Sequence, residues 1–251
     1  MARFVFGIPM YNLFVGIGIV SGILMFYHLC KKENIPSKYM DNIILLLVIS
    51  LFTGFFSSAA FDNFVHGKFN VIDIHTFFAG FTFYGGFIGG FVTILIGSFI
   101  LLKEGNRIYQ LLNILAICMI LGHAIGRIGC FLGGCCYGIS TDSILGVIFP
   151  IYDVNGSVTS YSKVLPTQLY EAGFLLVLFA FVYNRRERAF TYYFMGYGVF
   201  RFLIEFIRGD NRGILIIDTL QPSQYISILL ILIGVVLLIW RRRRENIEQL
   251  V

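Results

Sequence analysis

Seven mostly apolar stretches, each long enough to cross a lipid bilayer, alternate along this chain with short charged connections. A spanning helix needs about 20 such residues, because each residue adds about 1.5 Å to a hydrocarbon layer of about 30 Å. Only 13% of the 251 residues are charged, which is about half the share of a soluble domain. The stretches are roughly 10–30, 43–61, 76–102, 108–126, 166–183, 189–207 and 222–240. We therefore predict an all-α polytopic membrane helix bundle of about seven transmembrane helices, with residues 1–251 as a single transmembrane domain.

Lysine and arginine are distributed unevenly between the two sides that these connections define. Twelve lie on one side: Lys31, Lys32, Lys38, Lys103, Arg107, Arg185, Arg186, Arg188 and Arg241 to Arg244. Six lie on the other: Arg3, Lys68, Arg127, Lys163, Arg208 and Arg212. Because basic connections stay in the cytoplasm, we predict an outside N-terminus, a cytoplasmic C-terminus with a basic tail at 241–251, and an extracytoplasmic loop segment at 127–165. The net charge of +5 then belongs to membrane topology, and we expect no nucleic-acid partner.

The sixth stretch carries charges inside the bilayer. Arg201, Glu205 and Arg208 are spaced i, i+4 and i+7, so they share one helix face with Tyr197 one turn earlier. A charge at mid-bilayer costs about 2.5–3.5 kcal/mol, so this face must line the bundle interior. One interpretation is an ion pair that only fixes helix packing. The other is an anion site, since one glutamate cannot neutralise two arginines and Arg127 adds a third cation. Guanidinium groups bind phosphate oxygens through paired hydrogen bonds.

Arg127 opens the second unusual stretch, GRIGCFLGGCCYG at 126–138. It directly follows an apolar run, so we place it on a flexible, glycine-rich turn at the membrane edge. The thiols of Cys130, Cys135 and Cys136 match neither a CxxC pair nor a usual zinc spacing, so we predict no metal. A nucleophilic cysteine would need Arg127 or His123 beside it. We favour a structural role, which can include a disulfide between Cys130 and one of the other two.

Two further motifs leave two interpretations each. In LPTQLYEAG, Gln168 and Glu171 fall in the first turn of a helix behind Pro166. At this position the negative charge of Glu171 either interacts favourably with the helix dipole or belongs to a functional site. In TFYGGFIGGF, the paired glycines at 85–86 and 89–90 either allow close helix packing or border a lipid slot together with Tyr84.

Taken in order, these motifs resemble those of prolipoprotein diacylglyceryl transferases. The order is YGG (84–86), GRIGCFLGGCCYG (126–138), PTQLYE (166–171), GYGVFRFLIEFIRGDNRG (196–213) and SQYIS (223–227). The resemblance covers nearly the whole chain. It implies transfer of the diacylglyceryl group of phosphatidylglycerol to the lipobox cysteine of a prolipoprotein, with release of glycerol phosphate. The implied reaction takes place at the outer face of the bacterial cytoplasmic membrane and uses no metal or soluble cofactor.

The same resemblance assigns the site residues. Arg127 corresponds to the arginine of the family's signature loop and Arg201 to a second essential arginine. We expect Arg127, Arg201, Tyr84 and Glu205 to be catalytic. The expected substrate-binding residues are Gly85, Gly86, Gly129, Cys130, Gly134, Gln168, Glu171, Tyr197 and Arg208. The chain departs from better-known members where Tyr84 replaces a histidine, Cys130 and Gly133 replace asparagines, and Cys135 replaces a glutamate.

Other classes of function stay open at this point. A related transferase with another acceptor fits the departures in the signature loop. A lipid transporter or flippase would also bury charges, although we find no internal repeat and an odd number of spans. A non-catalytic membrane subunit would hold an ion pair without a cavity. We expect a monomer whose partners are phosphatidylglycerol, the lipobox peptide and membrane lipids.

Overall fold

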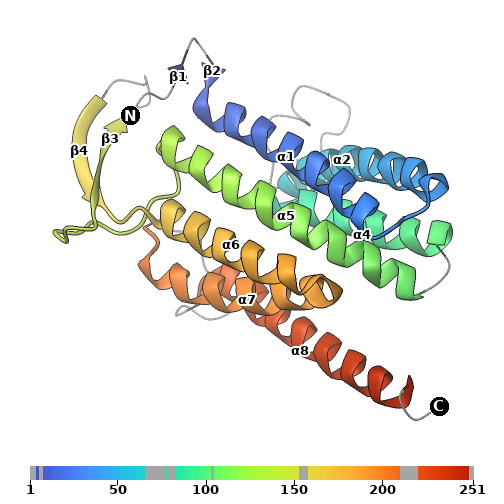
Figure 1. Ribbon diagram of the computed structural model, residues 1–251. Helices are drawn as coiled ribbons and strands as arrows, with labels where there is room; N and C mark the ends of the chain where they lie inside the picture. The colour runs from blue at the N-terminus through green and yellow to red at the C-terminus, as the bar shows by residue number, and fades with distance from the viewer. Residues whose placement is uncertain are drawn as a thin grey trace. The chain divides into compact units, whose positions relative to one another are not determined.

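The structure is a computed structural model that describes residues 4–5, 8–65, 77, 83–102, 105–152, 158–209 and 220–248. Long helices dominate this part of the chain (Figure 1). They are α1 (Met10–Lys32), α2 (Ser37–Val65), α4 (Phe83–Leu102), α5 (Gly105–Gly133), α6 (Thr167–Asn184), α7 (Ala189–Ile204) and α8 (Pro222–Glu248). Two 3₁₀ turns (Arg186–Arg188 and Glu205–Ile207) and the strands β1 (Phe4–Val5), β2 (Ile8–Pro9), β3 (Val147–Tyr152) and β4 (Val158–Val164) complete it.

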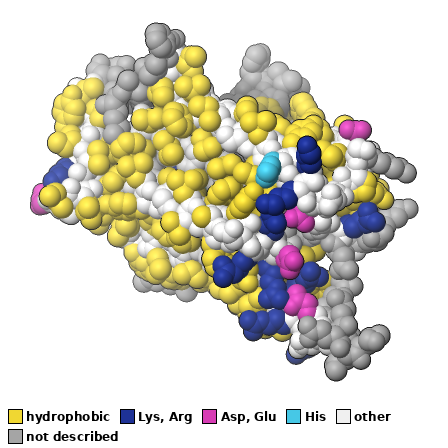
Figure 2. All heavy atoms as spheres, viewed as in Figure 1, with side chains coloured by type: hydrophobic (Ala, Val, Ile, Leu, Met, Phe, Trp, Pro, Cys, Tyr) yellow, Lys and Arg dark blue, Asp and Glu magenta, His cyan; other side chains and the backbone are white. Residues whose placement is uncertain are grey.

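Five of these helices are long and apolar enough to cross a membrane, among the residues that the structure describes. They are α1, α2, α4, α5 and α8. Large apolar side chains on them remain exposed, such as Leu24 at 65% and Leu51 at 63%, and hydrophobic side chains cover much of the face in Figure 2. Such surfaces require lipid around them. The prediction of an all-α membrane protein is confirmed. The helices α6 and α7, with 18 and 16 residues, are not among the five, so the count of seven stays a prediction.

The end of α5 differs from the prediction. The apolar run was expected to end at 126, but the helix continues to Gly133, so the placement of Arg127 on a flexible turn is wrong. No proline interrupts this stretch, and glycine is tolerated in membrane helices. The helix ends in a Schellman motif, in which Cys135 N donates to Cys130 O at 3.1 Å and Gly134 N donates to Phe131 O at 3.1 Å. Gly134 has the left-handed backbone (φ +71°) that this motif requires.

A β-hairpin occupies part of the segment that we expected to be a loop. Strands β3 and β4 pair antiparallel from Val147↔Val164 to Tyr152↔Val158. Its base is joined to neighbouring segments by backbone hydrogen bonds: Gly138 N donates to Leu165 O at 2.8 Å, and Ile139 N donates to Ile207 O at 3.0 Å. The end of α5, the start of α6 and the end of α7 are therefore fastened together at the hairpin.

The chain divides into two compact units, residues 1–29 with 112–251, and residues 30–111. In the second unit, α2 packs against α4 through glycines. A Cβ atom added at Gly85 would lie 2.5 Å from Phe61 Cβ, and one added at Gly89 would lie 2.0 Å from Ser57 Oγ. Ser57 Oγ also donates a hydrogen bond to Gly85 O at 2.6 Å. Of the two interpretations of this glycine pattern, close helix packing is the one observed.

In the first unit, α1 crosses α5 at a pair of glycines. A Cβ atom added at Gly18 would lie 2.9 Å from Gly122 O, and one added at Gly122 would lie 3.1 Å from Gly18 O. Nearer the start of α5, the buried amide of Asn113 donates to Glu187 O at 2.8 Å and accepts from Phe190 N at 2.9 Å. The first turn of α7 is thereby fixed to α5.

We expect Gly18→Val to destabilise the protein by about 1–3 kcal/mol, because the backbone of α5 cannot move away from the added side chain at low cost. The measurement is the midpoint of thermal unfolding in detergent micelles. Gly16→Val is the matched control, since a Cβ atom there meets nothing within 4 Å and introduces the same β-branched residue into α1. Equal midpoints for the two variants would contradict the crossing.

Candidate active site

Three helices of the first unit meet at the carboxylate of Glu171. Arg127 on α5 places Nη2 3.0 Å from Glu171 Oε1, and Tyr197 on α7 donates its hydroxyl to the same oxygen at 2.8 Å. Glu171, near the start of α6, has a side chain only 1% exposed. Of the two interpretations of Glu171, membership of a polar cluster is the one observed. Removal of either charged partner would leave an uncompensated charge in the interior.

His123 completes this arrangement one turn before Arg127. Its Nε2 accepts a hydrogen bond from Arg127 Nε at 3.2 Å and lies 3.5 Å from Glu171 Oε1. Its ring packs edge-on against Tyr197, with centroids 5.1 Å apart. The guanidinium group of Arg127 is therefore held from two sides, which fixes the direction of its remaining donors.

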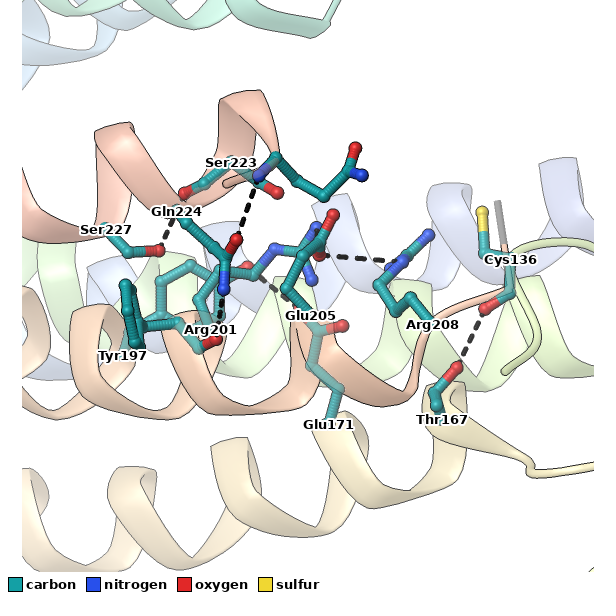
Figure 3. Close-up of polar contacts among 12 residues, drawn as sticks. Cys136, Thr167, Glu171, Tyr197, Arg201, Glu205, Arg208, Ser223, Gln224 and Ser227 are labelled. Carbon is teal, nitrogen blue, oxygen red and sulfur yellow. Dashed lines mark hydrogen bonds and ion pairs between the residues drawn. The ribbon is translucent and has the colours of Figure 1, made fainter. Parts of the chain in front are cut away.

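A second ion-pair group lies at the end of α7. Arg201 Nη2 is 2.7 Å from Glu205 Oε2, and Arg208 Nε is 3.9 Å from the same oxygen (Figure 3). The predicted common helix face holds for Arg201 and Glu205. Arg208 follows the 3₁₀ turn with an extended backbone (φ −78°, ψ 143°), yet its side chain returns to Glu205. All three residues are buried.

The two groups act on each other electrostatically. Glu171 interacts with Arg201 as well as with Arg127 and His123. The sequence analysis set Glu205 alone against the three arginines. The structure adds a second carboxylate, Glu171, which pairs with Arg127. The guanidinium groups of Arg127, Arg201 and Arg208 thus gather around the two carboxylates of Glu171 and Glu205. Guanidinium groups gathered in this way suit the oxygens of a phosphate.

Several buried polar atoms of this cluster have no hydrogen-bond partner within the described part of the chain. They are Arg201 Nη1, Glu205 Oε1, Glu171 Oε2 and Gln168 Oε1. Buried polar atoms in folded proteins are almost always paired, so each such atom requires an explanation. One donor and three acceptors on neighbouring side chains are what a ligand with both phosphate oxygens and hydroxyl groups would satisfy.

The cysteine turn is fastened to the same cluster. Gln168 Nε2 donates to Cys135 O at 2.5 Å. Thr167 Oγ1 donates to Cys136 O at 3.0 Å (Figure 3). The three cysteines of the turn are free thiols, so the disulfide that the sequence allowed is not formed. Hydrogen bonds from the thiols of Cys130 and Cys135, and then the charges of Arg208 and Arg127, hold the pKa of Cys136 below its usual range.

The predicted glycines do not all serve the cluster. A Cβ atom at Gly129 would lie 2.6 Å from Phe14 Cβ, so this glycine lets α1 pack against α5. Gly134 supplies the left-handed residue of the turn. Gly85 and Gly86 belong to the second unit, in the first turns of α4. Tyr84 is the second residue of the same helix, and its side chain is outside the described part of the chain.

Sequence reasoning gave no role to several polar residues around the site. Thr167 holds the cysteine turn, as described above. On α8, Gln224 donates to Phe202 O at 3.4 Å and Ser227 donates to Ser223 O at 2.8 Å (Figure 3). Ser223, Gln224 and Ser227 are all buried at 2% exposure or less. The signal was present as three polar residues spaced i, i+1 and i+4 at the start of an apolar helix.

Comparison with known proteins connects this geometry to a family. The family model described as prolipoprotein diacylglyceryl transferase matches residues 1–240. A phosphatidylglycerol–prolipoprotein diacylglyceryl transferase of Clostridium tetani is 31% identical over 236 residues, covering 90% of each chain. A second such enzyme of Clostridium perfringens is 30% identical over 245 residues, covering 93% of this chain and 91% of its own. The chain belongs to the prolipoprotein diacylglyceryl transferase family.

Proposed function

We propose that this protein transfers the diacylglyceryl group of phosphatidylglycerol to the lipobox cysteine thiol of a prolipoprotein. Family membership over residues 1–240 and the names of relatives that cover about 90% of the chain support the reaction. The observation that carries the proposal within this molecule is the gathering of the Arg127, Arg201 and Arg208 guanidinium groups around Glu171 and Glu205, with Arg201 Nη1 unpaired within the described residues. A phosphodiester head group offers the anionic oxygens that guanidinium groups bind.

The atoms that lack partners support the same lipid. Arg201 Nη1 is a donor that a phosphate oxygen would accept from, and the guanidinium fork suits two such contacts. Glu205 Oε1 and Glu171 Oε2 are acceptors. They would repel a phosphate oxygen, but they can accept hydrogen bonds from glycerol hydroxyls. Phosphatidylglycerol carries both chemistries in one head group. A flippase or a non-catalytic subunit gives no reason for acceptors beside the arginines.

The chemical step follows from where charge develops. The acceptor sulfur loses its proton and attacks the phosphate-bearing carbon of the diacylated glycerol unit, forming a C–S bond. The C–O bond on the opposite side breaks, and its electron pair leaves with glycerol phosphate. Negative charge grows on the leaving phosphate in the transition state, and Arg127 and Arg201 stabilise it more strongly there than in the bound lipid. Glu205 and Tyr84 are the proposed proton acceptors, with solvent as the alternative.

Glu171 is a positioning residue in this mechanism. It shares one oxygen between Arg127 and Tyr197 and so determines which guanidinium nitrogens of Arg127 remain available. The turn at Gly134 and Cys130 and the amide of Gln168 border the same cluster and complete the proposed lipid site. Gly85, Gly86 and Gly129 act through helix packing in this proposal, without contact to the lipid.

The proposed setting is the bacterial cytoplasmic membrane, with seven spans, an outside N-terminus and a cytoplasmic C-terminus. The ion pair of Arg188 with Glu245 supports the orientation, because it joins two connections that the distribution of basic residues assigns to the cytoplasm. The segment 127–165, with the hairpin and the cysteine turn, then faces outward, and 241–251 forms the basic cytoplasmic tail. We propose a monomer that binds phosphatidylglycerol and the prolipoprotein within the membrane.

Arg127→Lys and Arg201→Ala should each lower the transfer rate about a hundredfold or more, since each loses guanidinium donors that the leaving phosphate requires. The measurement uses purified protein, labelled phosphatidylglycerol and a lipobox peptide, with the product identified by mass. Arg243→Lys is the matched control, because this arginine lies on the exposed face of the α8 end. Transfer at the unmodified rate in both site variants would remove the mechanism.

Glu171→Gln keeps an acceptor for the Tyr197 hydroxyl but releases Arg127 from its ion pair and leaves that charge uncompensated, so the variant should unfold at a lower temperature and is assayed below that midpoint. We expect KM for phosphatidylglycerol to rise about tenfold or more, with a smaller change in kcat, because a freely rotating guanidinium group binds phosphate less well. Steady-state kinetics at varied lipid fraction in mixed micelles measure both constants. Glu245→Gln removes another ion-paired carboxylate and should leave both constants unchanged; an unaltered KM in Glu171→Gln would refute the positioning role.

A further inference from the structure

The transfer reaction proposed above uses no thiol of the protein, yet three thiols converge beside its site. The Sγ atoms of Cys130, Cys135 and Cys136 all lie within 4.8 Å of one another. Cys130 is buried, Cys136 is half-buried and Cys135 is exposed, so the cluster is anchored in the protein and open on one side. Such an arrangement offers three ligands and an entry path.

We infer that Cys130, Cys135 and Cys136 form a three-thiolate binding site for a soft divalent cation of the zinc class. Thiolates are the ligands that Zn²⁺ and Cd²⁺ prefer over oxygen donors. A Zn–S distance of about 2.3 Å with tetrahedral angles separates the sulfurs by about 3.8 Å. The present sulfurs need to approach by about 1 Å at most, which rotation about the Cα–Cβ bonds provides. The fourth position is left for water or an anion.

The end of α5 explains why an unusual spacing can bind metal. Zinc motifs commonly place two cysteines two residues apart on a tight turn, whereas here four residues separate Cys130 from Cys135. In the Schellman motif the residue after the left-handed glycine folds back over the last helical turn. Cys135 therefore lies close to Cys130, and its N donates a hydrogen bond to Cys130 O at 3.1 Å. Cys136 then follows with a left-handed backbone (φ 61°).

The turn is held in this conformation without a metal. Gln168 and Thr167 bind the carbonyl oxygens of Cys135 and Cys136, while Gly209 N donates to Tyr137 O at 3.3 Å on the other side. Because the backbone is fixed from both directions, metal binding has little conformational entropy to overcome.

The surrounding charges favour the bound state. Three thiolates and one divalent cation together carry a single negative charge. The positive charges of Arg208 and Arg127 act on Cys136, and Arg127 acts on Cys130 and Cys135 as well. An excess negative charge at this position is therefore compensated, as a buried metal–thiolate centre requires.

The test is titration of Cd²⁺ into the purified full-length protein in detergent, kept reduced with a phosphine that does not bind the metal strongly. The sulfur-to-cadmium charge-transfer absorption should rise to one Cd²⁺ per chain, and equimolar Zn²⁺ should compete for the same site. Cys30→Ala/Cys118→Ala is the matched control, since it removes the two other buried thiols and should leave the titration unchanged. The variant with Cys130, Cys135 and Cys136 all changed to serine should show no such absorption.

Cys135→Ser keeps the test decisive if the triple variant does not fold, because Cys135 is exposed and its loss leaves no cavity. Loss of an outer contact to a metal ligand already lowers affinity about tenfold or more, so loss of a direct ligand should weaken Cd²⁺ binding by at least that factor. Absence of the absorption in the reduced protein, its persistence in the triple variant, its loss in the control, or unchanged affinity in Cys135→Ser would each overturn the site.

Discussion

A guanidinium group inside an apolar helix bundle is tolerated only beside a carboxylate, and the site is arranged around that requirement. Arg127, Arg201 and Arg208 come from α5, α7 and the segment after α7, whereas Glu171 comes from α6. The pair of Arg127 with Glu171 joins α5 to α6, whereas Arg201 and Arg208 pair with Glu205 within four residues of it along the chain. The packing of α5 against α6 therefore has to bring Arg127 and Glu171 together. Packing and function thus depend on the same contacts.

The hydrogen bonding of this cluster is incomplete within the described residues, and the unpaired atoms are what a ligand can use. A fully paired set of side chains would only stabilise the fold. Here buried atoms of the ion-paired residues lack hydrogen-bond partners, among them Arg201 Nη1 and Glu205 Oε1. Such groups are unfavourable in the empty protein and favourable once a polar head group is bound. Binding energy is therefore available where the leaving phosphate must be stabilised.

Much of the fold followed from the sequence, because long apolar runs between charges have few alternatives in a membrane. The i, i+4 spacing of Arg201 and Glu205 placed them on one face, as observed. The sequence did not reveal that Glu171 would pair with Arg127, since forty-three residues and a hairpin separate them. It also missed the hairpin itself, although Asn155-Gly156 between two β-branched and aromatic stretches is a hairpin signal. Helical continuation through Gly126 and Gly129 was missed because glycine normally weakens helices in water.

The two hydrogen bonds of Asn113 to the start of α7 bear on how much the length of the preceding connection can change. Each residue turns a helix by about 100°, so a one-residue change in the connection before α7 would by itself swing Arg201 away from Glu171. Asn113 instead fixes the rotation of α7 at Phe190 N, downstream of that connection. Because Asn113 also binds Glu187 O, an insertion or deletion between Asn184 and Glu187 would be absorbed before these contacts, and the rotation of α7 would stay the same.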